Sequence, residues 1–165
     1  GCGLGPLLPY LLEQTGPTGQ VWGEDIDATL LDFIRYAATH GMPVLQRAHL
    51  LLGQHEDVML EAGAMDAVFL VQTLHCVEND LNEDERITGL TVKWLRSIRR
   101  AMRPNAVLII VEDGRHITPR FARKLLTQAG FVEDANIMSA ETGEIGEGST
   151  TGFILRERVA HKGGR

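Results

Sequence analysis

The first seven residues, Gly1-Cys2-Gly3-Leu4-Gly5-Pro6-Leu7, place three glycines at alternate positions directly before a helical run. Glycine has no Cβ atom, so a turn built from it lets the backbone approach a ligand closely. A helix that begins after such a turn directs its unpaired N–H groups towards the same place. The stretch therefore predicts a ligand-binding turn, with a tight structural turn as the alternative.

The spacing of the glycines separates this turn from the dinucleotide-binding fingerprint. That fingerprint reads G-x-G-x-x-G, and its third glycine comes one position later than Gly5 does here. Position 6 of this chain is a proline. A nicotinamide-dependent oxidoreductase is therefore the disfavoured alternative among enzymes that use such a turn.

The composition describes a globular chain with an acidic balance. The 165 residues are 44% hydrophobic and 23% charged, with a formal net charge of −6, which fits one domain with a substantial core. The negative charge disfavours nucleic acid as a partner, because domains that bind phosphate backbones usually carry a basic face. No apolar run approaches the ~20 residues of a membrane span. With two cysteines and no metal-binding spacing of histidines, we expect no disulfide scaffold, no metal site and a cytoplasmic location.

Strand-like and helix-like segments alternate along the chain. Four extended runs are expected to be strands: 20–26, 44–52, 65–71 and 106–111. Four runs with apolar residues at helical spacing are expected to be helices: 6–16, 28–40, 87–102 and 119–129, the last with Thr118 as its cap and Gly130 as its stop. The run 65–71 is so uniformly apolar that it predicts a central strand covered on both faces.

The last two expected strands, 131–139 and 152–159, are joined by a glycine-rich acidic segment and can pair as an antiparallel hairpin. The predicted fold class is therefore α/β, with a Rossmann-like, doubly wound and mostly parallel sheet that this C-terminal hairpin closes. Residues 1–160 are expected to form the domain and residues 161–165 a tail.

Several motifs occur in a recognisable order. The glycine turn is followed by the acidic strand end 21–26 (VWGEDI), by Met65-Asp66-Ala67-Val68, and by Leu74-His75; Pro104-Asn105 and Gln128-Ala129-Gly130-Phe131 come later. Taken together, these motifs resemble the class I S-adenosylmethionine-dependent methyltransferases, in the broad group that acts on small molecules. The resemblance covers essentially the whole chain.

The resemblance implies that S-adenosylmethionine is the cofactor and that a small molecule accepts the methyl group. Asp25 would accept hydrogen bonds from both ribose hydroxyls, with Glu24 as the competing acid. Gln54 stands where the family usually has an aspartate for the adenine amino group, which is a departure from the family pattern. The implied cofactor contacts are Gly1, Cys2, Gly3, Gly5, Glu24, Asp25, Ile26, Gln54, His55, Glu56 and Gln72.

The chemistry of such an enzyme needs mainly alignment, because the sulfonium already activates the methyl group. His75, near the carboxyl end of strand 65–71, is the candidate base for acceptors that must lose a proton. A histidine bonded to loop backbone is the structural alternative. A methyltransferase-like domain that serves as a binding or interaction module also stays open.

In this family the glycine turn follows a first strand, which lies between the strands that here are 20–25 and 65–71. No such strand precedes Gly1 in this sequence. We therefore expect that the sequence is a fragment of a longer protein and that the first strand is missing from it.

Overall fold

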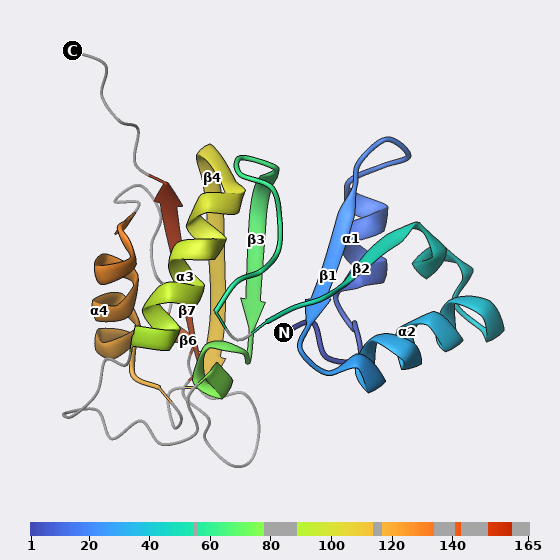
Figure 1. Ribbon diagram of the computed structural model, residues 1–165, viewed down its shortest axis with the longest axis horizontal. Coiled ribbons are helices and arrows are strands. Elements are labelled where there is room, and N and C mark those ends of the chain that lie inside the picture. Colours follow the sequence, from blue (N-terminus) through green and yellow to red (C-terminus); the bar gives the residue numbers. More distant parts are fainter. Residues whose placement is uncertain (55, 78–88, 114–116, 134–140, 143–151, 160–165) are drawn as a thin grey trace. The chain divides into compact units, whose positions relative to one another are not determined.

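The computed structural model describes residues 1–54, 56–77, 89–113, 117–133, 141–142 and 152–159 (Figure 1). The contacts divide the chain into two compact units, Gly1–Gln54 and His55–Arg165. The expected tail, 161–165, lies outside the described residues. Among the helices that the structure describes, none is long and apolar enough to cross a membrane.

The first unit is a small parallel sheet with two helices. Its elements are α1 (Leu8–Gln14), β1 (Val21–Asp25), α2 (Ala28–His40), the 3-10 helix η1 (Pro43–Arg47) and β2 (Ala48–Leu52). Strands β1 and β2 pair in parallel, with Val21 opposite Ala48 and Asp25 opposite Leu52. A core packs the helices on this sheet and contains Leu8, Leu12, Val21, Leu31, Ile34, Ala38 and Leu45.

Helix α2 begins and ends where the sequence predicts. The Asp27 side chain caps its first turn by accepting a hydrogen bond from the Thr29 amide at 2.8 Å, and Gly41 follows its last residue. Side-chain caps of this kind satisfy amides that have no partner within the helix. The local sequence therefore determines both limits of α2.

The strand expected over residues 44–52 is correct only in its second half. Residues Pro43–Arg47 form η1 instead. Proline fixes φ near the value that a helical turn needs, Leu45 is buried in the core, and the Gln46 side-chain amide donates to the Ala38 carbonyl at 3.1 Å. These contacts hold the turn against α2, so the extended backbone starts at Ala48.

The second unit contains a mixed sheet and two helices. Its elements are β3 (Met65–Val71), the 3-10 helix η2 (Leu74–Val77), α3 (Gly89–Ala101), β4 (Met102–Asp113), α4 (Pro119–Ala129), β5 (Phe131–Glu133), β6 (Glu141–Thr142) and β7 (Gly152–Val159). The strand order is β3-β4-β7-β5, with β6 also paired to β7. Strand β3 is parallel to β4, and β7 is antiparallel to both β4 and β5. Residues 134–140 and 143–151, which belong to the expected hairpin, lie outside the described part of the chain.

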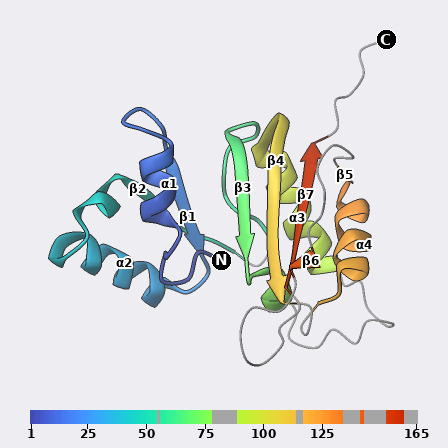
Figure 2. The same cartoon turned by 180° about the vertical axis from the view of Figure 1, so that it is seen from behind.

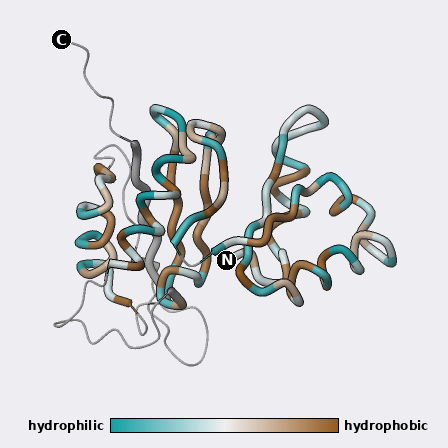
Figure 3. Tube along the Cα trace, in the orientation of Figure 1, coloured by the Kyte–Doolittle hydropathy of each residue, from teal (hydrophilic) through white to brown (hydrophobic). Residues whose placement is uncertain are grey.

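Helices α3 and α4 cover one face of this sheet, as the two opposite views show (Figures 1 and 2). Thr118 caps α4 by accepting from the Phe121 amide at 3.3 Å, and Gly130 ends it with φ of 90°. Both limits are as the sequence predicts. The hydrophobic colouring along β3 and β4 marks the strands that supply the core beneath these helices (Figure 3).

Strand β3 differs from the central strand that its apolar sequence predicts. It pairs with β4 alone among the described strands, and so it lies at the edge of its sheet. Leu70 is buried on the helix side, whereas Phe69 is 37% and Val71 is 43% exposed. Within the described residues of this unit, α3 and α4 cover only one face, so the alternate apolar side chains of β3 face outward.

Strand β4 begins earlier than the expected 106–111, because residues 103–105 form an irregularity within it rather than a loop before it. The pairing moves from Met65 opposite Met102 to Ala67 opposite Val107. Asn105 has a positive φ of 66°. A bulge of this kind lets a strand start directly after a helix and then enter its regular register.

Candidate functional site

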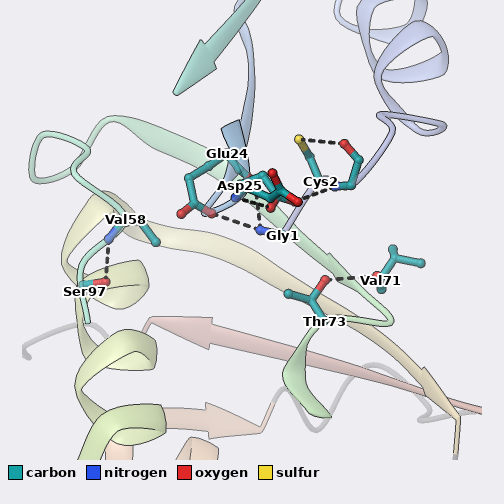
Figure 4. A network of polar contacts seen from close by, with 10 residues as sticks. Gly1, Cys2, Glu24, Asp25, Val58, Val71, Thr73 and Ser97 are labelled. Atoms are coloured by element: carbon teal, nitrogen blue, oxygen red, sulfur yellow. Dashed lines mark hydrogen bonds and ion pairs between the residues drawn. The ribbon is translucent and has the colours of Figure 1, made fainter. Parts of the chain in front are cut away.

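The glycine turn is held by the carboxyl end of β1. The Cys2 amide donates to the Glu24 carbonyl at 2.7 Å, and the Gly3 amide donates to Asp25 Oδ2 at 2.7 Å (Figure 4). The turn continues with the Gly5 amide, which donates to the Cys2 carbonyl at 2.9 Å. The predicted turn and the predicted acidic strand end are therefore in direct contact.

Two of the glycines serve different physical purposes. Gly5 has φ of 71°, and a Cβ atom added there would lie 2.9 Å from Leu8 Cδ1 and 3.1 Å from Ile34 Cδ1. Gly3 has φ of 55°, but a Cβ atom added there would meet no atom within 4 Å. Gly5 is thus required by the packing of α1 on α2, whereas Gly3 faces open space where a ligand can approach its backbone.

Asp25 is a buried acid that braces this turn. The residue is only 6% exposed, and besides the Gly3 amide its carboxylate accepts from the Asp27 amide through Oδ1 at 3.0 Å. Both oxygens therefore hold backbone amides, one from the glycine turn and one from the start of α2. A carboxylate that accepts from amides in this way fixes the relative position of the two segments.

Glu24 has a different environment. Its Oε2 lies 3.0 Å from the Gly1 nitrogen, while its Oε1 is buried and has no hydrogen-bond partner among the described residues. This carboxylate lies against Gly53, because a Cβ atom added to that glycine would stand 1.5 Å from Oε1. A buried acceptor without a donor is costly, so this oxygen is a candidate for a contact that the described residues do not supply. The sequence did not single out Gly53, which makes room for this carboxylate.

The other predicted cofactor contacts near the glycine turn differ in how exposed they are. Burial is the main cause that raises the pKa of the Cys2 thiol to about 11. Ile26 is 51% exposed, and Gln54 is also exposed. His55 lies outside the described residues.

The second unit begins at His55, and two of the predicted contacts that the structure describes belong to it. Glu56 is exposed and accepts from Lys93 Nζ at 3.2 Å. Gln72 is exposed and has a positive φ of 53°. Its backbone N–H donates to the Val111 carbonyl at 2.8 Å. The structure thus brings together Gly1, Cys2, Gly3, Gly5, Glu24 and Asp25 in the first unit, and it places Glu56 and Gln72 in the other unit.

The predicted base, His75, is held by an acid. Its Nδ1 lies 2.7 Å from Glu112 Oε2, and its Nε2 lies 3.2 Å from the sulfur of Cys76. A carboxylate accepts hydrogen bonds, so this contact fits the tautomer that carries its proton on Nδ1 and leaves Nε2 as the acceptor. A histidine oriented in this way can take up or release a proton at Nε2.

Glu112, at the end of β4, organises the whole turn after β3. It is 0% exposed, and its Oε1 accepts from the Thr73 amide at 2.8 Å and from the Leu74 amide at 2.5 Å. Sequence reasoning missed this residue. The signal that could have found it is an acid that directly follows a buried apolar strand, since the carboxyl ends of parallel strands meet at one edge of a sheet.

An α/β chain whose glycine turn meets an acid at the end of the following strand has the architecture of a cofactor-binding enzyme. Residues 1–110 match the family described as a methyltransferase domain. The chain belongs to this family and is a class I S-adenosylmethionine-dependent methyltransferase. A search of curated proteins gives no match.

Solved structures of S-adenosylmethionine-dependent methyltransferases share the fold. The protein from Aquifex aeolicus is 18% identical with a TM-score of 0.73, and the alignment covers 97% of this chain and 79% of that one. The Methanosarcina mazei protein is 18% identical with a TM-score of 0.71, covering 96% and 89%. The Mesorhizobium loti protein is 14% identical with a TM-score of 0.70, covering 96% and 88%.

Proposed function

We propose that this protein transfers the methyl group of S-adenosylmethionine to a small-molecule acceptor. Membership of the methyltransferase domain family supports the reaction class. The observation that carries the cofactor assignment is the buried, partnerless Oε1 of Glu24, which lies beside a glycine turn that faces open space. An acceptor that has no donor among the described residues fits a hydroxyl group of a ligand.

The residues of the first unit fit the cofactor. The backbone of residues 1–5 would hold the methionine part, because Gly3 presents no side chain there. Glu24 Oε1 and the carboxylate of Asp25 would accept from the ribose hydroxyls, and the exposed amide of Gln54 would meet the adenine amino group. Asp25 already accepts from two amides, so Glu24 has the greater free capacity to accept.

When bound, S-adenosylmethionine supplies a methyl group that its sulfonium has already activated. The part left to the protein is to align the acceptor and, for a protonated acceptor such as a hydroxyl group, to remove its proton. We assign the proton removal to His75 Nε2. Glu112 Oε2 would stabilise the charge that the ring gains, since it lies 2.7 Å from Nδ1.

Calorimetric titration of the protein with S-adenosylhomocysteine, and separately with NAD, tests the cofactor assignment. We expect binding of S-adenosylhomocysteine and none of NAD. Binding of NAD alone would support an oxidoreductase instead, and binding of neither would leave an interaction module. A glycine-turn variant, Gly3→Ala, should lose affinity for S-adenosylhomocysteine, which separates binding at this turn from binding elsewhere.

A further inference from the structure

The proposed methyl transfer does not use the thiol of Cys76, although this thiol has the chemical setting of a reactive nucleophile. Cys76 is exposed and follows His75 directly in η2. Its sulfur lies 3.2 Å from Nε2 of that histidine and, at the longer distance of 3.7 Å, faces the Gln72 carbonyl oxygen. The thiol is therefore placed to give its proton to the imidazole.

The carboxylate of Glu112 favours this proton transfer. Its Oε2 lies 2.7 Å from His75 Nδ1, on the opposite side of the ring from the sulfur. Glu112 is fully buried and accepts from the amides of Thr73 and Leu74 as well. Three donors hold the carboxylate in place beside the imidazole, so a positive charge that the ring gains from the thiol proton would face a carboxylate. A thiolate beside a protonated histidine is the reactive form of cysteine.

We propose that Cys76 is a modification site at which a peroxide oxidises the thiol to a sulfenic acid. The thiolate sulfur attacks one peroxide oxygen and forms an S–O bond while the O–O bond breaks. The sulfur is oxidised by two electrons and the peroxide is reduced. The leaving hydroxide takes the proton that His75 received from the thiol, so the products are the sulfenic acid, water and the neutral histidine.

The other cysteine of the chain provides a contrast within the same molecule. The pKa of the Cys2 thiol is raised to about 11, mainly by burial, so at neutral pH it is almost entirely in the unreactive protonated form. Cys2 lies in the first unit, where its amide holds the glycine turn to β1. A peroxide should therefore distinguish the two cysteines strongly.

The experiment treats the full chain with hydrogen peroxide in the presence of dimedone, which reacts with sulfenic acids, and measures labelling of the two cysteine peptides by mass spectrometry. We expect labelling at Cys76 and little at Cys2. The variant His75→Asn should lower the labelling rate at Cys76 by about tenfold or more, because it removes the proton acceptor. The matched variant His40→Asn, at an exposed histidine of α2, should leave that rate unchanged.

Glu112→Gln should also slow the labelling of Cys76, but it can loosen the turn that holds Thr73 and Leu74. His75→Asn leaves those two amide contacts in place and is therefore the decisive variant. Equal labelling rates at Cys76 in the parent and in His75→Asn would overturn the proposal. So would a rate in the folded parent no higher than in the parent unfolded in urea. Neither measurement depends on methyl transfer, so both stand whether or not the proposed function holds.

Discussion

The amide of Gly3 donates to Asp25 Oδ2 at 2.7 Å, which joins the glycine turn to an acid 22 positions later in the chain. The next acid towards the N-terminus, Glu24, instead keeps one buried oxygen without a donor among the described residues. Two adjacent carboxylates therefore have separate tasks. Asp25 shapes the turn, and we propose that Glu24 binds a ligand.

This division of tasks predicts different effects of two substitutions on stability. Asp25→Ala leaves two backbone amides without their acceptor and should lower the free energy of unfolding by about 1–3 kcal/mol. Glu24→Gln keeps a polar group beside the Gly1 nitrogen and removes the charge from the buried end of the side chain, where Oε1 has no donor among the described residues, so the free energy of unfolding should change little. Both variants should bind S-adenosylhomocysteine more weakly, Glu24→Gln by about 1 kcal/mol if a charge-assisted hydrogen bond becomes a neutral one. Urea denaturation and calorimetry measure the two quantities, and a destabilised Glu24→Gln with unchanged affinity would contradict the assignment.

Gly3 and Gly16 form a matched pair for testing the glycine turn. Both have positive φ, 55° and 70°, and a Cβ atom added at either would meet no atom within 4 Å. Changing either residue to alanine should therefore cost a similar ~1–2 kcal/mol of stability, because the left-handed conformation disfavours a side chain. Only Gly3→Ala should weaken S-adenosylhomocysteine binding, by about tenfold or more. Equal affinities of the two variants would mean that the turn at Gly3 is structural.

Gly53 offers an independent way to displace the Glu24 carboxylate. A Cβ atom at Gly53 would stand 1.5 Å from Glu24 Oε1, so Gly53→Ala must move that oxygen. We expect its affinity for S-adenosylhomocysteine to fall as in Glu24→Gln. Gly41→Ala is the control, since an added Cβ atom there meets nothing within 4 Å, and its affinity should equal that of the parent in the same calorimetric titration.

The second unit contains an ion pair that should make the free energy of unfolding depend on pH in the acid range. Arg100 donates to both Asp57 oxygens, at 2.9 and 2.7 Å, and this hydrogen bonding is the main cause that holds the pKa of Asp57 below its ordinary value of 3.8. A carboxyl group with a lowered pKa in the folded state stabilises the protein above the unfolded pKa. That contribution is lost as the pH falls through the folded pKa.

Asp57→Asn should therefore melt at a lower temperature than the parent at neutral pH, and the difference should shrink as the pH falls below about 4. Thermal melts between pH 3 and pH 7 measure this. Asp32→Asn, which alters the exposed pair of Asp32 and Arg35 on α2, is the matched control. A constant difference between parent and Asp57→Asn across this range would show that the ion pair has no such effect.

Local sequence determined the elements whose limits depend on nearby residues. Asp27 and Thr118 begin helices, and Gly41 and Gly130 end them, because a cap needs only residues within one turn. The alternating strands and helices likewise predicted an α/β fold. The sequence also predicted that the glycine turn and the acids after it act together, and the structure brings them into direct contact.

Tertiary contacts decided what those local patterns could not. Residues 43–47 form a helical turn because Leu45 enters the core and Gln46 reaches Ala38. The separate roles of Glu24 and Asp25 depend on contacts with Gly53 and Gly3, far away in the sequence. Glu112 meets the backbone of Thr73 and Leu74 only because β3 and β4 pair in parallel and end side by side. Sequence by itself determined which chemical groups are present and where the chain turns. The fold decided which buried oxygens receive a hydrogen bond, because such a bond depends on the distance between residues that are remote in the chain.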